Sequence, residues 1–147
     1  MVTIRQLVHQ KGNKVYSATP DTPIMDVLKL LGQKDIGAVV VLEGAKIVGI
    51  FSERDLARHL AKDPEFDIKT PVKKLMTKQI FFVRPDQAID DCMVIMSQKH
   101  IRHLPVLDGE NLVGVISIGD VVKEIISDKE VTIRSLENYI LGREYNQ

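Results

Sequence analysis

The chain has 147 residues, of which 44% are hydrophobic, and this is enough to fill the core of one compact domain or of two small, tightly packed ones. Twenty basic residues balance twenty acidic ones, so no net charge favours a nucleic acid or an anionic membrane surface as a partner. The longest apolar runs are far shorter than the roughly 20 residues of a membrane span, and no secretory signal is recognisable, so we expect a cytoplasmic protein.

The first strongly periodic segment predicts an amphipathic helix. Apolar residues recur at the spacing of one helix face at Ile24, Val27, Leu28 and Leu31. The run "AVVVL", an acidic residue with a glycine (Glu43-Gly44) and the run "KIVGIF" then predict a strand, a turn and an antiparallel strand. A second helix follows at "DLARHLA". We therefore expect a β-α-β-β-α unit in residues 7–63.

A connector follows in residues 64–79, and after it the pattern repeats. Residues 19–55 align without a gap with residues 84–120, at an offset of 65 residues and with fourteen identities in 37 positions. We expect a second β-α-β-β-α unit in residues 80–130, with Phe81 and Phe82 opening its first strand. A repeat of this kind cannot bury its apolar surface alone, so the two units should pack face to face.

The end of the chain, residues 131–147, predicts a C-terminal helix and tail. Ile133, Leu136, Tyr139 and Ile140 have helical spacing, and Gly142 is a plausible stop. This apolar stripe needs a partner surface.

Both repeats carry the pattern G-h-h-S-x-x-D at a predicted strand-to-helix junction. The two copies are Gly49, Ser52, Asp55 and Gly114, Ser117, Asp120. One interpretation is helix capping, in which the serine and the acid bond backbone N–H groups at the helix start. The other is a nucleotide cradle: free N–H groups and a hydroxyl for phosphate, a carboxylate for ribose hydroxyls, and a glycine that leaves room for a flat ring.

The doubled motif, each copy preceded by a helix, a strand and an acidic–glycine turn, resembles a tandem pair of cystathionine-β-synthase (CBS) domains, a Bateman module, over about residues 7 to 130. The resemblance implies an α/β (α+β) fold of two repeats packed as a pseudo-twofold pair with two quasi-equivalent clefts. It further implies binding of adenosine-containing ligands such as AMP, ADP, ATP, NAD or S-adenosylmethionine, a regulatory rather than catalytic role, and disc-like homodimers.

The resemblance also assigns residues to the clefts. Asp120 and Ser117 would hold the ribose and phosphate of one ligand, and Asp55 and Ser52 those of the other. Arg102 and His103 would meet the phosphate in the Asp120 cleft, because in the family the basic residues before the second strand serve the aspartate of their own repeat. Other expected ligand-binding residues are Thr19, Pro20, Ile36, Gly37, Ala38, Pro105 and Ile116.

The two clefts should be unequal. The first repeat has Gly37 and Ala38 where the second has Arg102 and His103, so the Asp55 cleft lacks its expected phosphate partner unless Arg54 substitutes for it. We therefore expect the Asp120 cleft to be the tighter phosphate site.

We expect no metal site, because His100 and His103 have no further ligand at a recognisable spacing. Cys92, the only cysteine, allows no disulfide within the chain. We also expect no catalytic activity and no catalytic cofactor, because no nucleophile stands beside a plausible base.

The expected function is that of a stand-alone regulatory protein that binds an adenosine nucleotide and signals through a change of shape or through an effector protein. A homodimer through the helices and the C-terminal stripe is expected. The alternatives are a structural dimerisation module with empty clefts and a nucleotide-modifying enzyme.

Overall fold

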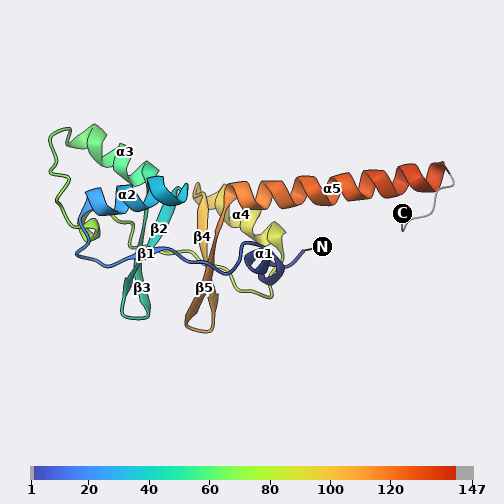
Figure 1. Ribbon diagram of the computed structural model, residues 1–147, viewed down its shortest axis with the longest axis horizontal. Coiled ribbons are helices and arrows are strands. Elements are labelled where there is room, and N and C mark those ends of the chain that lie inside the picture. Colours follow the sequence, from blue (N-terminus) through green and yellow to red (C-terminus); the bar gives the residue numbers. More distant parts are fainter. Residues whose placement is uncertain (1, 142–147) are drawn as a thin grey trace.

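The computed structural model describes residues 2–141 and contains two similar units side by side (Figure 1). The first unit consists of β1 (Ser17–Ala18), α2 (Ile24–Lys34), β2 (Ala38–Glu43), β3 (Lys46–Ser52) and α3 (Glu53–Lys62). The second consists of α4 (Ile89–Lys99), β4 (His103–Asp108), β5 (Asn111–Ser117) and α5 (Ile118–Ile140). Two further elements, α1 (Ile4–Gln10) and the short 3-10 helix η1 (Val72–Lys74), precede the first and the second unit. This is the mixed α/β architecture that the repeat predicts.

The two β-hairpins have the same register, as the repeat requires. β2 pairs antiparallel with β3, so that Ala38 lies opposite Ser52, and β4 pairs with β5, so that His103 lies opposite Ser117. The turns contain Gly44 and Gly109, whose φ angles of 63° and 62° suit a residue without a Cβ. The predicted acidic–glycine turns are thus confirmed.

The predicted first strand is short in one repeat and missing in the other. β1 has two residues and runs parallel to β2. The prediction that Phe81 and Phe82 open a strand is wrong, since only Val83 pairs there, in an isolated parallel bridge with Val106. Extending the ladder would require a backbone N–H at Pro105, which proline lacks. The first repeat has Val40 at that position, and its pairing continues over Ser17 and Ala18.

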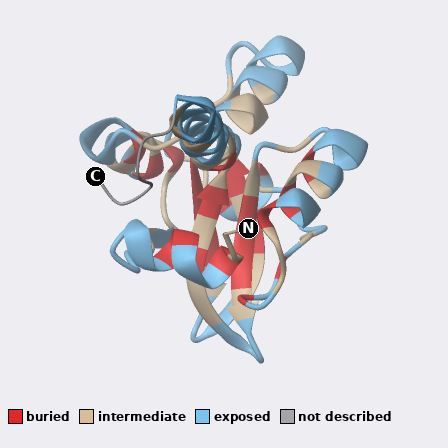
Figure 2. Ribbon diagram, turned by 90° about the vertical axis from the view of Figure 1, so that its right-hand side faces the viewer, coloured by how far each residue is buried: buried red, intermediate tan, exposed pale blue. Residues whose placement is uncertain are grey.

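The two hydrophobic cores exchange their N-terminal segments. Ile4, Leu7 and Val8 of α1 are buried in the core of the second unit, with Val83 and Leu104 among their neighbours. Val72 and Leu75, from the connector around η1, are buried in the core of the first unit. Each core therefore includes a segment that precedes the other repeat in the sequence. Figure 2 shows both groups of buried residues along the strands and the helix faces that cover them.

The C-terminal helix is not separate from the second repeat. The sequence predicts one helix within residues 80–130 and another from residue 131, but residues 118–140 form the single 23-residue helix α5. No glycine or proline interrupts α5 after its first turn, so nothing breaks it at residue 130. Its second half extends beyond the rest of the molecule (Figure 1). The predicted stop, Gly142, lies outside the described residues.

Candidate functional site

The two motif serines and aspartates form capping boxes at the helices that follow them. In the first unit the Ser52 N–H donates to Asp55 Oδ2 over 2.9 Å, and the Asp55 N–H donates to Ser52 Oγ over 3.4 Å. In the second unit the corresponding distances between Ser117 and Asp120 are 2.9 and 3.2 Å. The capping role is therefore present in both copies. It uses one carboxylate oxygen of each aspartate, which leaves the role of the other oxygen open.

The motif glycines do not leave room for a ligand ring, and this expectation is wrong. A Cβ atom on Gly49 would lie 2.4 Å from the Met76 sulfur, and one on Gly114 would lie 2.9 Å from a methyl of Val8. Met76 follows η1, and Val8 belongs to α1. The glycines are needed because the exchanged N-terminal segments cross the strands at these points, which leaves no space for a side chain.

Neutral donors satisfy the Asp55 carboxylate. Oδ2 accepts from the Ser52 N–H and the Ser52 hydroxyl, and Oδ1 accepts from the Thr77 hydroxyl over 3.0 Å. No cation lies within ion-pair distance of Asp55 among residues 2–141. The cations around Asp55 therefore form no ion pair with its carboxylate.

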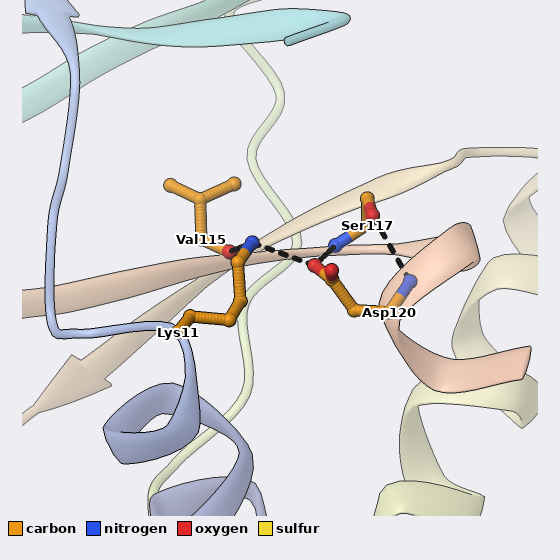
Figure 3. A network of polar contacts seen from close by, with 4 residues as sticks. All are labelled: Lys11, Val115, Ser117 and Asp120. Carbon is orange, nitrogen blue, oxygen red and sulfur yellow. Dashed lines mark hydrogen bonds and ion pairs between the residues drawn. The ribbon is translucent and has the colours of Figure 1, made fainter. Parts of the chain in front are cut away.

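Asp120 has a cationic partner instead. The Lys11 ammonium donates to Asp120 Oδ2 over 2.6 Å and to the Val115 carbonyl over 2.8 Å (Figure 3). Burial alone would raise the pKa of the Asp120 carboxyl, but hydrogen bonds from Lys11 and from Ser117 outweigh it and lower that pKa below 3.8. The carboxylate is thus ionised, and its Oδ1 atom has no hydrogen-bond partner within the described part of the chain.

Each motif aspartate lines a cavity between the two units. The cavity at Asp55 has a volume of about 470 Å³ and the cavity at Asp120 about 440 Å³. Most residues that line the Asp120 cavity have a counterpart 65 positions away that lines the Asp55 cavity. Besides the two aspartates, the counterparts are Lys14 and Gln79, Val15 and Ile80, Tyr16 and Phe81, Asp35 and His100, Ile36 and Ile101, Gly37 and Arg102, Ala38 and His103, Val115 and Ile50, and Ser117 and Ser52. The clefts are quasi-equivalent, as the resemblance implies.

The strand-entry segment of each repeat lines the cavity of the other repeat's aspartate. Ile36, Gly37 and Ala38 line the Asp120 cavity, whereas Arg102 lines the Asp55 cavity and not that of Asp120. The expected assignment of Arg102 to the cleft of its own repeat is therefore wrong. Consecutive side chains of an extended segment point to opposite sides, so Arg102 faces away from its own repeat's cavity.

The expected inequality is also reversed in charge. The Asp55 cavity, which was expected to lack a phosphate partner, is lined by Arg54, Arg58, Lys99 and Arg102. Arg54 extends across the cavity from α3, and its Nη1 donates to the His100 carbonyl over 2.7 Å. The Asp120 cavity contains two lysines, Lys11 and Lys14, and one of them is already paired with the motif aspartate.

The remaining expected residues fall into two groups. Ser52, Arg54, Asp55 and Pro105 line the Asp55 cavity, and Ser117 and Asp120 line the other. Thr19, Pro20 and Ile116 line neither cavity. Thr19 bonds the hydroxyl of Thr22, the Pro20 carbonyl accepts from Lys73, and Ile116 is completely buried in the second core.

His103 belongs to both cavities, together with Gly37. A Cβ atom on Gly37 would lie 3.1 Å from His103 Nε2, so the imidazole packs directly against the glycine backbone. Burial lowers the pKa of the His103 imidazole below 6.5. Lys11 adds to this effect, Asp120 opposes it, and Arg102 and Arg54 lower the pKa further. The two clefts thus share a wall that contains a neutral imidazole at pH 7.

Sequence reasoning missed the segments before each first strand. Lys11, Lys14 and Tyr16 line the Asp120 cavity, and Gln79 and Phe81 line the other. Extending the 65-residue alignment below residue 19 pairs Tyr16 with Phe81, and this pairing is the signal that would have found them.

Residues 2–141 contain neither a metal-ligand cluster nor a membrane-spanning helix. No group of three or more His, Cys, Asp or Glu side chains is arranged to hold a metal ion. No helix in this part of the chain has both the length and the apolar character needed to cross a membrane. A third cavity of about 450 Å³ lies beside α1 and contains neither motif aspartate.

The family model of the CBS domain matches the chain twice, at residues 4–62 and 72–127. The chain belongs to the CBS-domain family. The first match includes α1 and the second includes η1, so each CBS repeat in sequence begins with the segment that packs on the other core.

Several relatives cover most of this CBS pair. A signal-transduction protein with CBS domains from Burkholderia ambifaria, described in its structure as putative, has a TM-score of 0.81 at 40% identity over 86% of this chain and 96% of its own. The mitochondrial CBS domain-containing protein CBSX3 of Arabidopsis thaliana is 30% identical over 95% of this chain and 72% of its own length. The structure of CBSX2 in complex with AMP has a TM-score of 0.71 at 26% identity and covers 88% of this chain and 99% of that one.

Proposed function

We propose that this protein is a regulatory sensor that binds adenosine-containing ligands, of the AMP, ADP, ATP or NAD type, in the two motif cavities. The observation that carries the proposal is the pair of quasi-equivalent cavities, each with a motif serine and a motif aspartate at a helix N-terminus. A carboxylate can accept hydrogen bonds from neighbouring ribose hydroxyls, and cavities of this size accommodate a nucleotide. The relative CBSX2 in complex with AMP supports the same ligand class.

The role that we propose is regulatory and cytoplasmic. A ligand can shift such a protein only through different affinities for two of its states. Because the two repeats enclose each cavity together, a ligand there contacts both and can change their relative position. An effector protein would then recognise the change.

A structural module with empty clefts is the second candidate, and specific observations favour it. Both motifs act as capping boxes, and both glycines are explained by packing. The two candidates differ in what they expect from ligands. Thermal unfolding with a panel of adenosine, AMP, ADP, ATP and NAD separates them, because a ligand present at about 100 times its Kd stabilises the folded protein by roughly 2.7 kcal/mol. If no ligand in the panel raises Tm, the sensor proposal fails.

Replacing each motif aspartate by glutamate separates capping from ligand binding. Glutamate is the usual acid of a capping box, so Asp55→Glu and Asp120→Glu should preserve the cap and leave Tm without ligand nearly unchanged. The added methylene displaces the carboxylate by about one bond length, so each substitution should reduce the ligand-induced shift of its own cavity. A double variant that retains the full shift contradicts the assignment of the aspartates to ribose.

Product analysis tests the enzymatic alternative. We expect AMP, ATP and NAD to be recovered unchanged after prolonged incubation with the protein. Conversion that depends on Asp55 or Asp120 would replace the sensor by an enzyme.

We also propose a homodimer in which the projecting half of α5 packs against a second copy. Ile126, Ile133 and Ile140 are spaced seven residues apart, and their exposed fractions are 52%, 56% and 78%. Val122 and Leu136 flank this row at the intermediate spacing of a coiled-coil seam. Light scattering at micromolar concentration should give a dimer mass, and Ile133→Glu should reduce it to that of a monomer. A monomer mass for the unmodified chain contradicts this part of the proposal.

A further inference from the structure

The two cavities differ in charge far more than in size. Three arginines and one lysine line the Asp55 cavity, and two carboxylates, Asp55 and Glu53, oppose them. In the Asp120 cavity Lys11 and Lys14 face two carboxylates, Asp35 and Asp120. The volumes of about 470 and 440 Å³ are nearly equal. Any preference between ligands of similar size should therefore come from charge.

The cations of the Asp55 cavity are available to a ligand. Arg54, Arg58, Lys99 and Arg102 form no ion pair within residues 2–141. Arg54 uses one guanidinium N–H on the His100 carbonyl, and the other four remain. Lys99 lies over the Phe81 ring, with its ammonium 5.0 Å from the ring centroid, in the wall of the same cavity.

The different hydrogen-bond partners of the two motif aspartates account for the difference in unpaired cations between the cavities. Asp55 is satisfied by the Ser52 backbone and by two hydroxyls, so the surrounding arginines are not needed to stabilise it. Asp120 is stabilised by Lys11, so a ligand phosphate in that cavity must compete with the carboxylate for this ammonium. Only Lys14 is left there as an unpaired cation within the described part of the chain.

We propose that the two cavities sort adenosine ligands by phosphate charge. The Asp55 cavity takes nucleoside di- and triphosphates, and the Asp120 cavity takes the nucleoside or its monophosphate. This inference rests on the proposed function. Each additional phosphate brings negative charge that unpaired arginines can bind with charge-assisted hydrogen bonds. A cavity whose cations and carboxylates balance gains nothing from that charge.

Two tryptophan reporters can follow each cavity separately. The chain has no tryptophan, and Tyr16 and Phe81 occupy equivalent wall positions of the two cavities. Phe81→Trp should report binding at Asp55, and Tyr16→Trp binding at Asp120. Each variant is titrated with adenosine, AMP, ADP and ATP without magnesium, and calorimetry on the unmodified chain checks the affinities.

At the Phe81→Trp reporter we expect ATP to bind at least about tenfold more tightly than AMP, which corresponds to about 1.4 kcal/mol. At the Tyr16→Trp reporter we expect AMP and ATP to differ by about threefold or less, or AMP to bind more tightly. A preference for ATP over AMP that is no larger at the Phe81→Trp reporter than at the Tyr16→Trp reporter overturns the inference while leaving the proposed function intact. If neither reporter nor calorimetry detects any of the four ligands, and NAD does not raise Tm either, the proposed function itself fails.

Charge removal provides the matched control. Arg58 and Arg102 are exposed, so the double variant Arg58→Ala, Arg102→Ala should fold normally. In the Phe81→Trp background this double variant should lower the affinity for ATP by about tenfold and the affinity for AMP by about threefold or less. Lys14→Ala, which removes an exposed cation from the other cavity, should leave ATP binding at this reporter unchanged. Equal losses of ATP and AMP in the double variant contradict selection by charge.

Discussion

The packing of Val8 against Gly114 gives a test of why the motif glycines are present. A Cβ atom on Gly114 would lie 2.9 and 3.0 Å from the two Val8 methyls. Such distances force a shift, and Val8 has little freedom because it is 5% exposed in the second core and β-branched on α1. Overpacking of this kind costs about 1–3 kcal/mol. For a chain of this length each kcal/mol lowers Tm by about 2–4 °C.

We therefore expect Gly114→Ala to lower Tm by about 2–12 °C in thermal unfolding. If there were no clash, replacing glycine by alanine would stabilise the protein by about 0.4–1 kcal/mol, because alanine lowers the conformational entropy of the unfolded chain. A steric role of Gly114 and the absence of such a role therefore predict changes in stability of opposite sign. Gly49→Ala is the matched variant. Its Cβ would contact Met76, whose unbranched side chain can move, so its cost should be smaller although the closest distance is only 2.4 Å.

A double-mutant cycle makes the test specific to this contact. Val8→Ala removes both methyls, so it should cost about 1 kcal/mol less in the Gly114→Ala background than in the unmodified chain. A stable Gly114→Ala variant, or two substitutions whose effects simply add, would refute the packing explanation.

Three further results are expected from the ionisable groups. The lowered pKa of Asp120 means that its ionised form stabilises the fold above about pH 4, and that this contribution is lost as pH falls through the folded-state pKa. Lys11→Met should therefore reduce stability at pH 7 and make the loss of stability in acid less steep. An unchanged dependence of stability on pH in acid contradicts the pairing of Lys11 with Asp120. The lowered pKa of His103 means that the unfolded chain binds the proton more readily, so stability should fall as pH drops below about 6.5. His103→Gln should make this fall smaller when stability is measured by urea unfolding at several pH values. The same dependence of stability on pH in the variant would show that other groups cause the fall. Burial, with the nearby Asp91 charge, raises the pKa of the Cys92 thiol to about 11. A thiol reagent at pH 8 should therefore label the protein only when it unfolds. Rapid labelling of the folded chain would contradict the burial of this side chain.

The repeat itself could be predicted because its signals are local. The offset between Gly49 and Gly114, the acidic–glycine turns and the spacing of apolar residues all depend on neighbours along the chain. The helices, the hairpins and the capping boxes follow from such patterns, and the structure contains them. The position of Pro105 in β4 was visible too, and its missing N–H would have argued against a long first strand in the second repeat.

The composition of the clefts could not be predicted in the same way. An alignment shows that Arg102 and Gly37 are equivalent, but not which cavity each one lines, because that depends on how the two units pack. The same holds for α1: no helix was predicted over residues 4–10, and the apolar face of Ile4, Leu7 and Val8 does not indicate which core buries it. The role of Gly114 was misjudged for this reason, since Val8 is 106 positions away in the sequence.

The crossing of the two N-terminal segments ties the halves of the chain together in folding and in descent. If the chain is cut between its repeats, the first fragment keeps α1, which packs on the second core, and the second fragment keeps η1, which packs on the first core. Each fragment then has an exposed hydrophobic face. A half-length ancestor with the same crossing would have been complete only as a pair of identical chains with two identical clefts. Within one polypeptide the two clefts need not be identical, and the arginines that line only the Asp55 cavity are such a difference.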